Sequence, residues 1–134
     1  EELGGKPTEG IGFAIGLERL IMIMKAQGAD KEFFDESDNT PDIFVASIGG
    51  DADIKAQKLV YDLRQAGIRA ERDLCDRSVK AQMKFANKLG SKYSIVLGDD
   101  EISQNKAALK NMQTGEAEDI SLSADEIADR IKAE

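Results

Sequence analysis

The chain has 134 residues, of which 41% are hydrophobic and 33% are charged, and its formal net charge is −8. This length allows one ordinary domain with a core and a short appendage, and the composition is typical of a globular protein rather than a disordered one. The longest apolar run, residues 20–24, is far shorter than the ~18 residues that a membrane span needs, so no membrane partner is expected. The single Cys75 excludes an internal disulfide, indicates a reducing compartment and predicts a buried or half-buried thiol.

The first 27 residues are Gly-rich and then strongly apolar. Gly10, Gly12 and Gly16 precede the run LERLIMIM at residues 17–24, which predicts a strand followed by a helix that begins near Gly16. The chain opens without Met in the middle of a Gly-rich phrase, as expected of a segment taken from inside a longer protein. Residues 28–41 are acidic and lack periodicity, so they are predicted to be a linker.

From Asp42 onward, strand-like and helix-like segments alternate. The apolar run 43–46 is typical of a buried strand. Helical spacing follows through Ile54, Leu59, Val60 and Leu63, and Gly67 is a C-terminal capping signal. Residues 68–73 fit a second strand.

The second half of the domain continues in the same way. Ser78 is expected to cap a helix that runs to Gly90, and residues 93–97 read as a third buried strand. A turn is expected at 98–101, two strands at 106–112 and 118–122, and a final amphipathic helix that Ser123 caps and that carries Ile127 and Ile131 on one face. The order β-α-β-α-β followed by β-β-α predicts a three-layer α/β domain over residues 42–134, whose first three strands are parallel because right-handed crossovers connect them.

The charges are unevenly distributed along the chain. Residues 64–92 hold eight basic and three acidic side chains, which leaves 10 basic and 23 acidic residues elsewhere. A basic island on an acidic body can bind one RNA locally and repel other polyanions.

Three groups of residues are candidates for chemistry. The first group lies around Gly12 and Gly16, where a helix amino terminus and the Arg19 guanidinium suit phosphate oxygens. The same pattern also fits a Gly-containing strand that packs on an apolar helix and leaves Arg19 in solvent. Four cations on and just before the predicted helix after Ser78 fall within an arc of ~80° of the helical wheel: Arg77, Lys80, Lys84 and Lys88. They form either an RNA-binding stripe or a solvated face. The acidic turn GDDE at 98–101 offers Glu101 as an acceptor for the edge of an unstacked base, or is a plain acidic turn.

The sequences GGKPT at 4–8 and GIGFAIGLERL at 10–20 resemble motif 3 of class II aminoacyl-tRNA synthetases, in the form found in histidyl-tRNA synthetases. The resemblance implies that residues 1–27 are the end of a catalytic domain, where Arg19 contacts an ATP phosphate as a catalytic residue and Gly16 lies under the nucleotide. Motifs 1 and 2 would lie upstream, so this chain alone should be inactive.

Residues 42–134 resemble the anticodon-binding domain of the same family, with a Gly-x-x-Glu at 98–101 after the third strand. The resemblance implies a mixed five-stranded sheet of order 2-1-3-4-5 with an antiparallel fourth strand and three helices. It implies that Glu101 reads an anticodon base, that the basic helix contacts RNA, and that Lys110 is a weaker anticodon contact.

The implied function is that of a cytoplasmic, homodimeric histidine–tRNA ligase, which uses ATP with Mg²⁺ to attach histidine to tRNA(His). No metal ligands are expected in this chain, and no bound cofactor. One alternative is a non-catalytic, synthetase-like module that binds tRNA as a regulatory or accessory subunit. A doubly wound signalling domain is a weaker alternative, because it predicts clustered carboxylates where residues 47–50 read SIGG.

Overall fold

The computed structural model describes residues 4–6, 10–29 and 40–133. The chain divides into two units, residues 1–39 and 40–134, and the predicted linker 28–41 lies mostly outside the described residues. In the first unit, helix α1 spans Leu17–Ala26 with Gly16 at its N-cap. The strand expected before it is wrong for the described residues 10–16, since a strand needs a hydrogen-bonded neighbour and none is present there.

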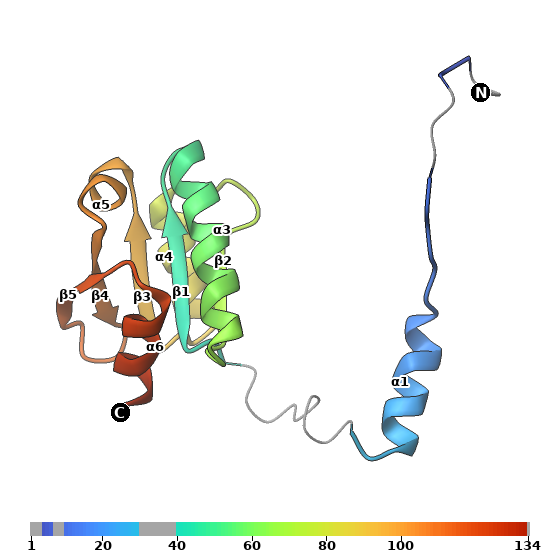
Figure 1. Cartoon of the computed structure of the whole chain (residues 1–134). Helices are drawn as coiled ribbons and strands as arrows, with labels where there is room; N and C mark the ends of the chain where they lie inside the picture. Colours follow the sequence, from blue (N-terminus) through green and yellow to red (C-terminus); the bar gives the residue numbers. More distant parts are fainter. Residues whose placement is uncertain (1–3, 7–9, 30–39, 134) are drawn as a thin grey trace. The chain divides into compact units, whose positions relative to one another are not determined.

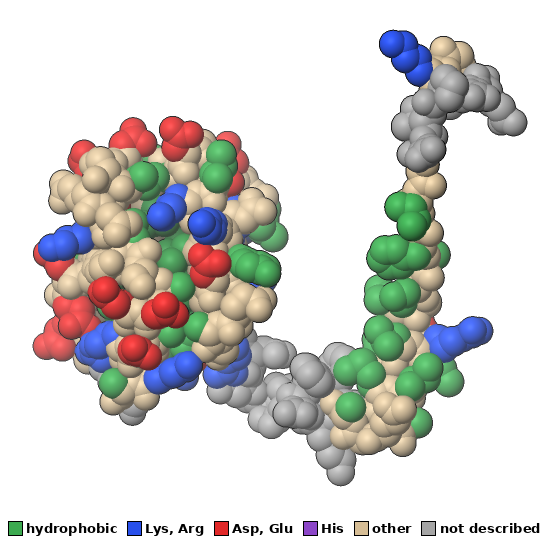
Figure 2. All heavy atoms as spheres, in the orientation of Figure 1, with side chains coloured by type: hydrophobic (Ala, Val, Ile, Leu, Met, Phe, Trp, Pro, Cys, Tyr) green, Lys and Arg blue, Asp and Glu red, His purple; other side chains and the backbone are tan. Residues whose placement is uncertain are grey.

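Helix α1 exposes its apolar side chains, as Figure 2 shows. None of its residues is buried, and Leu17 and Met22 are 67% and 70% exposed. Burial of such side chains is worth roughly 1.5–3 kcal/mol each, so exposed apolar surface of this kind favours association with other apolar surface.

We expect deletion of residues 1–27 to leave the second unit folded and to reduce self-association. The second unit holds a complete sheet, while the deleted residues carry the exposed apolar helix. The shortened chain should unfold in one cooperative thermal transition and sediment as a smaller species than the 134-residue chain. A dye-binding, non-cooperative product would contradict the first expectation, and unchanged sedimentation would contradict the second.

The second unit is built on a five-stranded sheet of order β2-β1-β3-β4-β5. Strand β1 pairs in parallel with β2 and β3, while β3–β4 and β4–β5 are antiparallel. The predicted order and strand directions are therefore confirmed. The strands are β1 (Ile43–Ser47), β2 (Ala70–Arg72), β3 (Tyr93–Leu97), β4 (Lys106–Asn111) and β5 (Ala117–Ser121).

Helices cover both faces of this sheet, which gives the predicted three layers (Figure 1). Helices α3 (Gly50–Gln65) and α6 (Ala124–Lys132) pack on one face, and α4 (Val79–Lys88) packs on the other, against β1 and β3. The turn predicted at 98–101 is instead the start of a short helix, α5 (Asp99–Gln104). Three acidic residues in its first turn favour the helix, because carboxylates are stabilised near a helix amino terminus.

The main core lies between the sheet and helices α3 and α6. Leu63 of α3, Ile95 of β3 and Ile127 of α6 are fully buried there. Ile54 shares the helical spacing of Leu59 and Leu63, but it is 69% exposed. The small residues Ala52 and Ala56 occupy the buried turns of α3 before Leu59. Small side chains at these positions let the helix approach the sheet closely.

A smaller core lies under α4. Phe44 and Ala46 of β1 and Ala86 of α4 are fully buried, with Phe85 and Met83 packed around them. The rings of Phe44 and Phe85 meet edge to face, with centroids 6.1 Å apart, an arrangement that aromatic quadrupoles favour. This contact fixes the position of α4 on the sheet.

Asp42 connects the beginnings of the three parallel strands. Its carboxylate accepts hydrogen bonds from the Arg69 backbone N–H at 3.0 Å and from Lys92 Nζ at 2.9 Å. Burial alone would raise the pKa of Asp42, but the bonds from Lys92 and Arg69 outweigh it and hold the pKa below its usual value.

We expect Asp42→Asn to lower the free energy of unfolding at pH 7 by about 1 kcal/mol. A carboxyl whose pKa is lower in the folded than in the unfolded state stabilises the fold above its unfolded pKa. That contribution is lost as the pH falls through the lowered pKa of the folded state. Urea unfolding at pH 7 and pH 3 should show the difference between wild type and variant shrinking with acid. A constant difference would show that the charge is not responsible.

Candidate nucleic-acid interface

The eight cations of residues 64–92 fall into two groups. Five of them form ion pairs with neighbouring carboxylates: Arg64 with Glu71, Arg69 and Lys92 with Asp42, Arg72 with Asp53, and Arg77 with Asp73. The other three, Lys80, Lys84 and Lys88, are exposed on α4, and no carboxylate among the described residues pairs with them. Free positive charge within this stretch is therefore confined to one helix face.

Arg77 differs from these three lysines. It precedes the first residue of α4, and its guanidinium contacts the Asp73 carboxylate at 2.7 Å. The same guanidinium lies 4.2 Å from the centroid of the Phe85 ring, a cation–π contact. Arg77, predicted as a member of the exposed stripe, is held in the structure as part of the scaffold.

Asp73 closes the loop between β2 and α4. Its carboxylate accepts the backbone N–H groups of Cys75 at 3.1 Å and Arg77 at 2.8 Å. Burial alone would raise the pKa of Asp73, but these hydrogen bonds and the Arg77 charge hold the pKa below its usual value. The carboxylate therefore stays ionised inside the loop at neutral pH.

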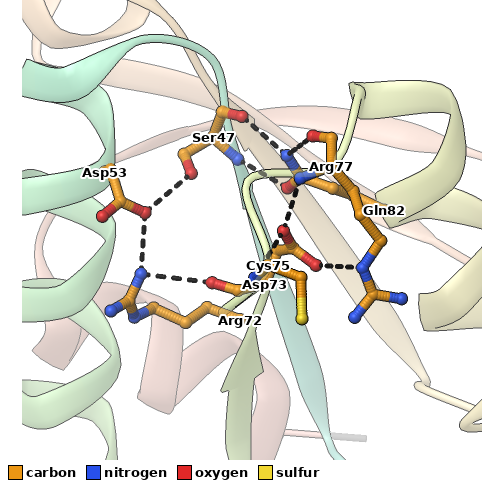
Figure 3. A network of polar contacts seen from close by, with 7 residues as sticks. All are labelled: Ser47, Asp53, Arg72, Asp73, Cys75, Arg77 and Gln82. Carbon is orange, nitrogen blue, oxygen red and sulfur yellow. Dashed lines mark hydrogen bonds and ion pairs between the residues drawn. The ribbon is translucent and has the colours of Figure 1, made fainter.

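Gln82, on the buried side of α4, connects this loop to the sheet. Its amide oxygen accepts the Ser47 N–H at 3.0 Å, and its amide nitrogen donates to the Ser47 carbonyl at 2.9 Å and to the Arg77 carbonyl at 2.7 Å. Figure 3 shows these bonds beside the Asp73–Arg77 pair and the bridge from Arg72 through Asp53 to Ser47. A continuous polar network thus joins the ends of β1 and β2 to α4.

A hollow of about 480 Å³ adjoins this network at the carboxyl ends of β1 and β2. Its lining includes Ser47, Asp53, Arg72, Leu74 and Gln82. Leu74 is 76% exposed. The hollow therefore combines hydrogen-bonding groups with one open apolar side chain, a mixture that suits an unstacked nucleobase.

Glu101 lies at the end of the neighbouring strand β3, half-buried in the first turn of α5. Its Oε2 accepts the Gly98 N–H at 2.9 Å, which is the half of a capping box that a glycine N-cap allows. One carboxylate oxygen is thus engaged by the protein. Oε1 is the oxygen left for an external donor.

Lys110 lies on β4 opposite Ser94 of β3. It is exposed, while its neighbour Leu109 is buried in the core under α3 and α6. Side chains alternate between the faces of a strand, so Lys110 is on the sheet face that α4 packs against. The α4 lysines and Lys110 therefore share one side of the sheet.

In the first unit, Gly16 and Arg19 form the amino-terminal turn of α1. Both are exposed, and the Leu20 N–H already bonds the Gly16 carbonyl. A helix amino terminus with an arginine in its first turn fits an anionic group, so these two residues are compatible with a phosphate.

One local expectation is wrong, and two others are confirmed in position but not in side-chain contact. Cys75 is exposed rather than buried, because Asp73 holds the loop turned away from the core. Ser78 and Ser123 do occupy N-cap positions, but neither side chain makes a capping hydrogen bond.

The buried polar residues Asp73 and Gln82 were not predicted as site residues. Only the tertiary partners of Gln82, 35 residues away at Ser47, identify its role. The described residues contain no cluster of His, Cys, Asp or Glu suited to a metal ion. None of their helices has the length and apolar character required to cross a membrane.

Comparison with known proteins gives a consistent picture. The profile of the family described as "Anticodon binding domain" matches residues 42–134. The chain is 58% identical over 132 residues to a histidine–tRNA ligase of Acetivibrio thermocellus and 43% identical to one of Clostridium perfringens. Both matches include 98% of this chain, but they span only 30% and 31% of the length of the two relatives.

Solved structures agree with these relatives. The crystal structure of apo histidyl-tRNA synthetase from S. aureus matches 87% of this chain with a TM-score of 0.66 and 40% identity, and the match spans 28% of that protein. The RNA-binding domain of threonyl-tRNA synthetase from Cryptosporidium parvum, at 19% identity and a TM-score of 0.63, shares the fold. The chain therefore belongs to the anticodon-binding domain family, and its matches align it with the carboxy-terminal part of histidine–tRNA ligases.

Proposed function

We propose that this chain is the anticodon-reading arm of a histidine–tRNA ligase and that its RNA partner is tRNA(His). The observation that carries the proposal is the separation of charges on the second unit. Three unpaired lysines on α4 lie on an acidic body whose other cations in residues 64–92 are neutralised by carboxylates. Within this stretch, such a surface concentrates the attraction for a phosphate backbone on α4.

In this proposal, phosphate contacts position the RNA and base contacts specify it. Lys80, Lys84 and Lys88 contact phosphates, and Lys110 adds a weaker contact from the same side of the sheet. Glu101 accepts hydrogen bonds from a base through Oε1, since Oε2 is engaged by Gly98. Arg77 supports the loop before α4 rather than reaching a phosphate.

The chain spans about 30% of the length of a curated relative that it matches. The whole protein is proposed to be a cytoplasmic homodimer. Bound ATP with Mg²⁺ would supply the adenylate chemistry that activates histidine. Within this chain, Gly16 leaves room beside the helix amino terminus because it has no side chain, and Arg19 neutralises phosphate charge. The remaining catalytic groups would come from the rest of the protein.

We expect Lys84→Ala to weaken binding of tRNA(His) and of an anticodon-swapped tRNA by the same factor. A flexible cation attracts any phosphate, so its loss should also reduce the slope of log K against log salt by about one unit or somewhat less. Filter binding across a salt series measures both quantities. Lys58→Ala, an exposed lysine on α3 on the opposite side of the sheet, is the matched control and should change neither.

A selective loss for the cognate tRNA would show that Lys84 reads a base. An unchanged salt slope would show that α4 does not lie on the RNA backbone, and it would remove the main support for the proposed function.

A further inference from the structure

The last two residues of β1 have a strand on only one side. Strand β2 pairs with β1 only from Ile43 to Val45, whereas β3 pairs along the whole of β1 up to Ser47. After Arg72 the chain leaves the sheet at Asp73, so Ser47 has no strand neighbour on the β2 side. Buried backbone groups without partners are costly.

The Gln82 side chain fills that position. Its amide oxygen and nitrogen bind the N–H and the carbonyl of Ser47 at 3.0 and 2.9 Å, as a neighbouring peptide group would. The second amide hydrogen goes to the Arg77 carbonyl. Gln82 is 2% exposed, so water cannot take over these bonds. A single amide thus extends the sheet by one pairing and ties it to the loop before α4 (Figure 3).

The loop 73–78 is held at Arg77 from three directions. Asp73 accepts the Arg77 N–H, Gln82 binds the Arg77 carbonyl, and the guanidinium lies between Asp73 and the Phe85 ring. Asp76 within this loop has a positive φ of 49°, a conformation that is costly for a residue with a side chain. Several bonds therefore hold one loop shape beside the hollow.

We propose that Gln82 and Asp73 are positioning residues for RNA recognition. They fix the end of β1 and the loop 73–78 on either side of the hollow. The hydrogen-bonding groups that line the hollow are therefore in place before RNA binds. This inference rests on the proposed function. Gln82 faces away from solvent and need not touch RNA, so it acts through Ser47 and Arg77. Pre-organisation of this kind improves binding because less ordering is needed on association.

The test uses the 134-residue chain and two RNA hairpins, one with the anticodon stem and loop of tRNA(His) and one with the anticodon bases permuted. Gln82→Met keeps the length of the side chain and removes all three hydrogen bonds. Gln57→Met, at an exposed position of α3, is the matched control. Circular dichroism fixes a temperature at which all the proteins are folded, and affinities are measured there across a salt series.

We expect Gln82→Met to reduce the preference for the cognate hairpin by about tenfold, the factor for one good base contact, without changing the salt slope. The control should keep the wild-type preference. A variant that lost only stability would keep both the preference and the slope at this temperature. Full preference in folded Gln82→Met would overturn the inference and leave the proposed function intact.

If wild type does not distinguish the two hairpins, the proposed function fails, and the inference fails with it. If Gln82→Met does not fold, Asp73→Asn is tested in its place. The measured quantity is again the ratio of the affinities for the cognate and the permuted hairpin. That variant keeps an acceptor for the two N–H groups and removes the charge that orients Arg77. Reduced preference with an unchanged salt slope supports the proposal, and unchanged preference overturns it.

Discussion

Replacing Phe44 with Ala is expected to lower the free energy of unfolding by about 3–5 kcal/mol. The ring is fully buried between β1 and α4, and it supports Phe85 edge to face. Its removal leaves a cavity under the only helix on that face of the sheet among the described elements. Domains of this size are stable by roughly 5–15 kcal/mol, so the loss is a large fraction of the total. Urea denaturation measures it directly.

Tyr61→Ala provides the control for this experiment. Tyr61 is an aromatic residue on α3 that is 63% exposed, so its truncation should change stability by less than about 0.5 kcal/mol. The Phe44 variant should also bind RNA more weakly at temperatures near its lowered midpoint, because α4 carries the unpaired lysines. A loss below about 1 kcal/mol for Phe44→Ala would show that α4 collapses onto the sheet without this ring.

A comparison of two Glu101 variants is expected to distinguish a role in reading an RNA base from a role in shaping the start of α5. Glu101→Ala removes the acceptor for the Gly98 N–H as well as the free oxygen, whereas Glu101→Gln keeps one acceptor oxygen for the cap. If Oε1 reads a base, both variants should reduce the difference in binding free energy between cognate and anticodon-swapped tRNA by roughly 1–3 kcal/mol. Neither should alter the salt slope, since the carboxylate does not contact phosphate.

The stabilities of the two variants then identify the part played by the cap. Loss of a capping interaction costs about 0.5–2 kcal/mol, so Glu101→Ala should be less stable than Glu101→Gln. Glu101→Gln with full discrimination would show that the carboxylate only shapes the start of α5. Equal losses for both tRNAs on removing Glu101 would lead to the same conclusion.

The architecture of the second unit could be predicted from the sequence to a large extent. Apolar runs such as 93–97, and glycines such as Gly67 and Gly90, which adopt positive φ at the ends of α3 and α4, are local signals that survive in the fold. The β-α-β-α-β pattern predicts the parallel directions of the first three strands, whereas the strand order and the antiparallel fourth strand rest on the family resemblance. Helix α5 is not predicted from the sequence because its N-cap is a glycine, which carries no side-chain signal.

The candidate site could be predicted only in part. A row of lysines at helical spacing is visible in the sequence, and it is exposed on α4 as expected. Which cations are free is largely a tertiary property, because Asp42 and Asp53 reach Lys92 and Arg72 across different elements. The role of Gln82 depends on where β2 stops. No local pattern encodes the end of a strand that lies ten residues upstream.

The clustering of three lysines without a carboxylate partner among the described residues on α4 of an acidic protein has a kinetic consequence. At an ionic strength near 0.1 M, charges are screened beyond about 10 Å, so RNA approaching α4 interacts mainly with the nearby lysines. In dilute salt the screening length grows, and the net charge of −8 repels the RNA before it arrives. Long-range attraction, which accelerates many encounters with nucleic acids, is therefore absent here, and productive collisions depend on the orientation in which the two molecules meet.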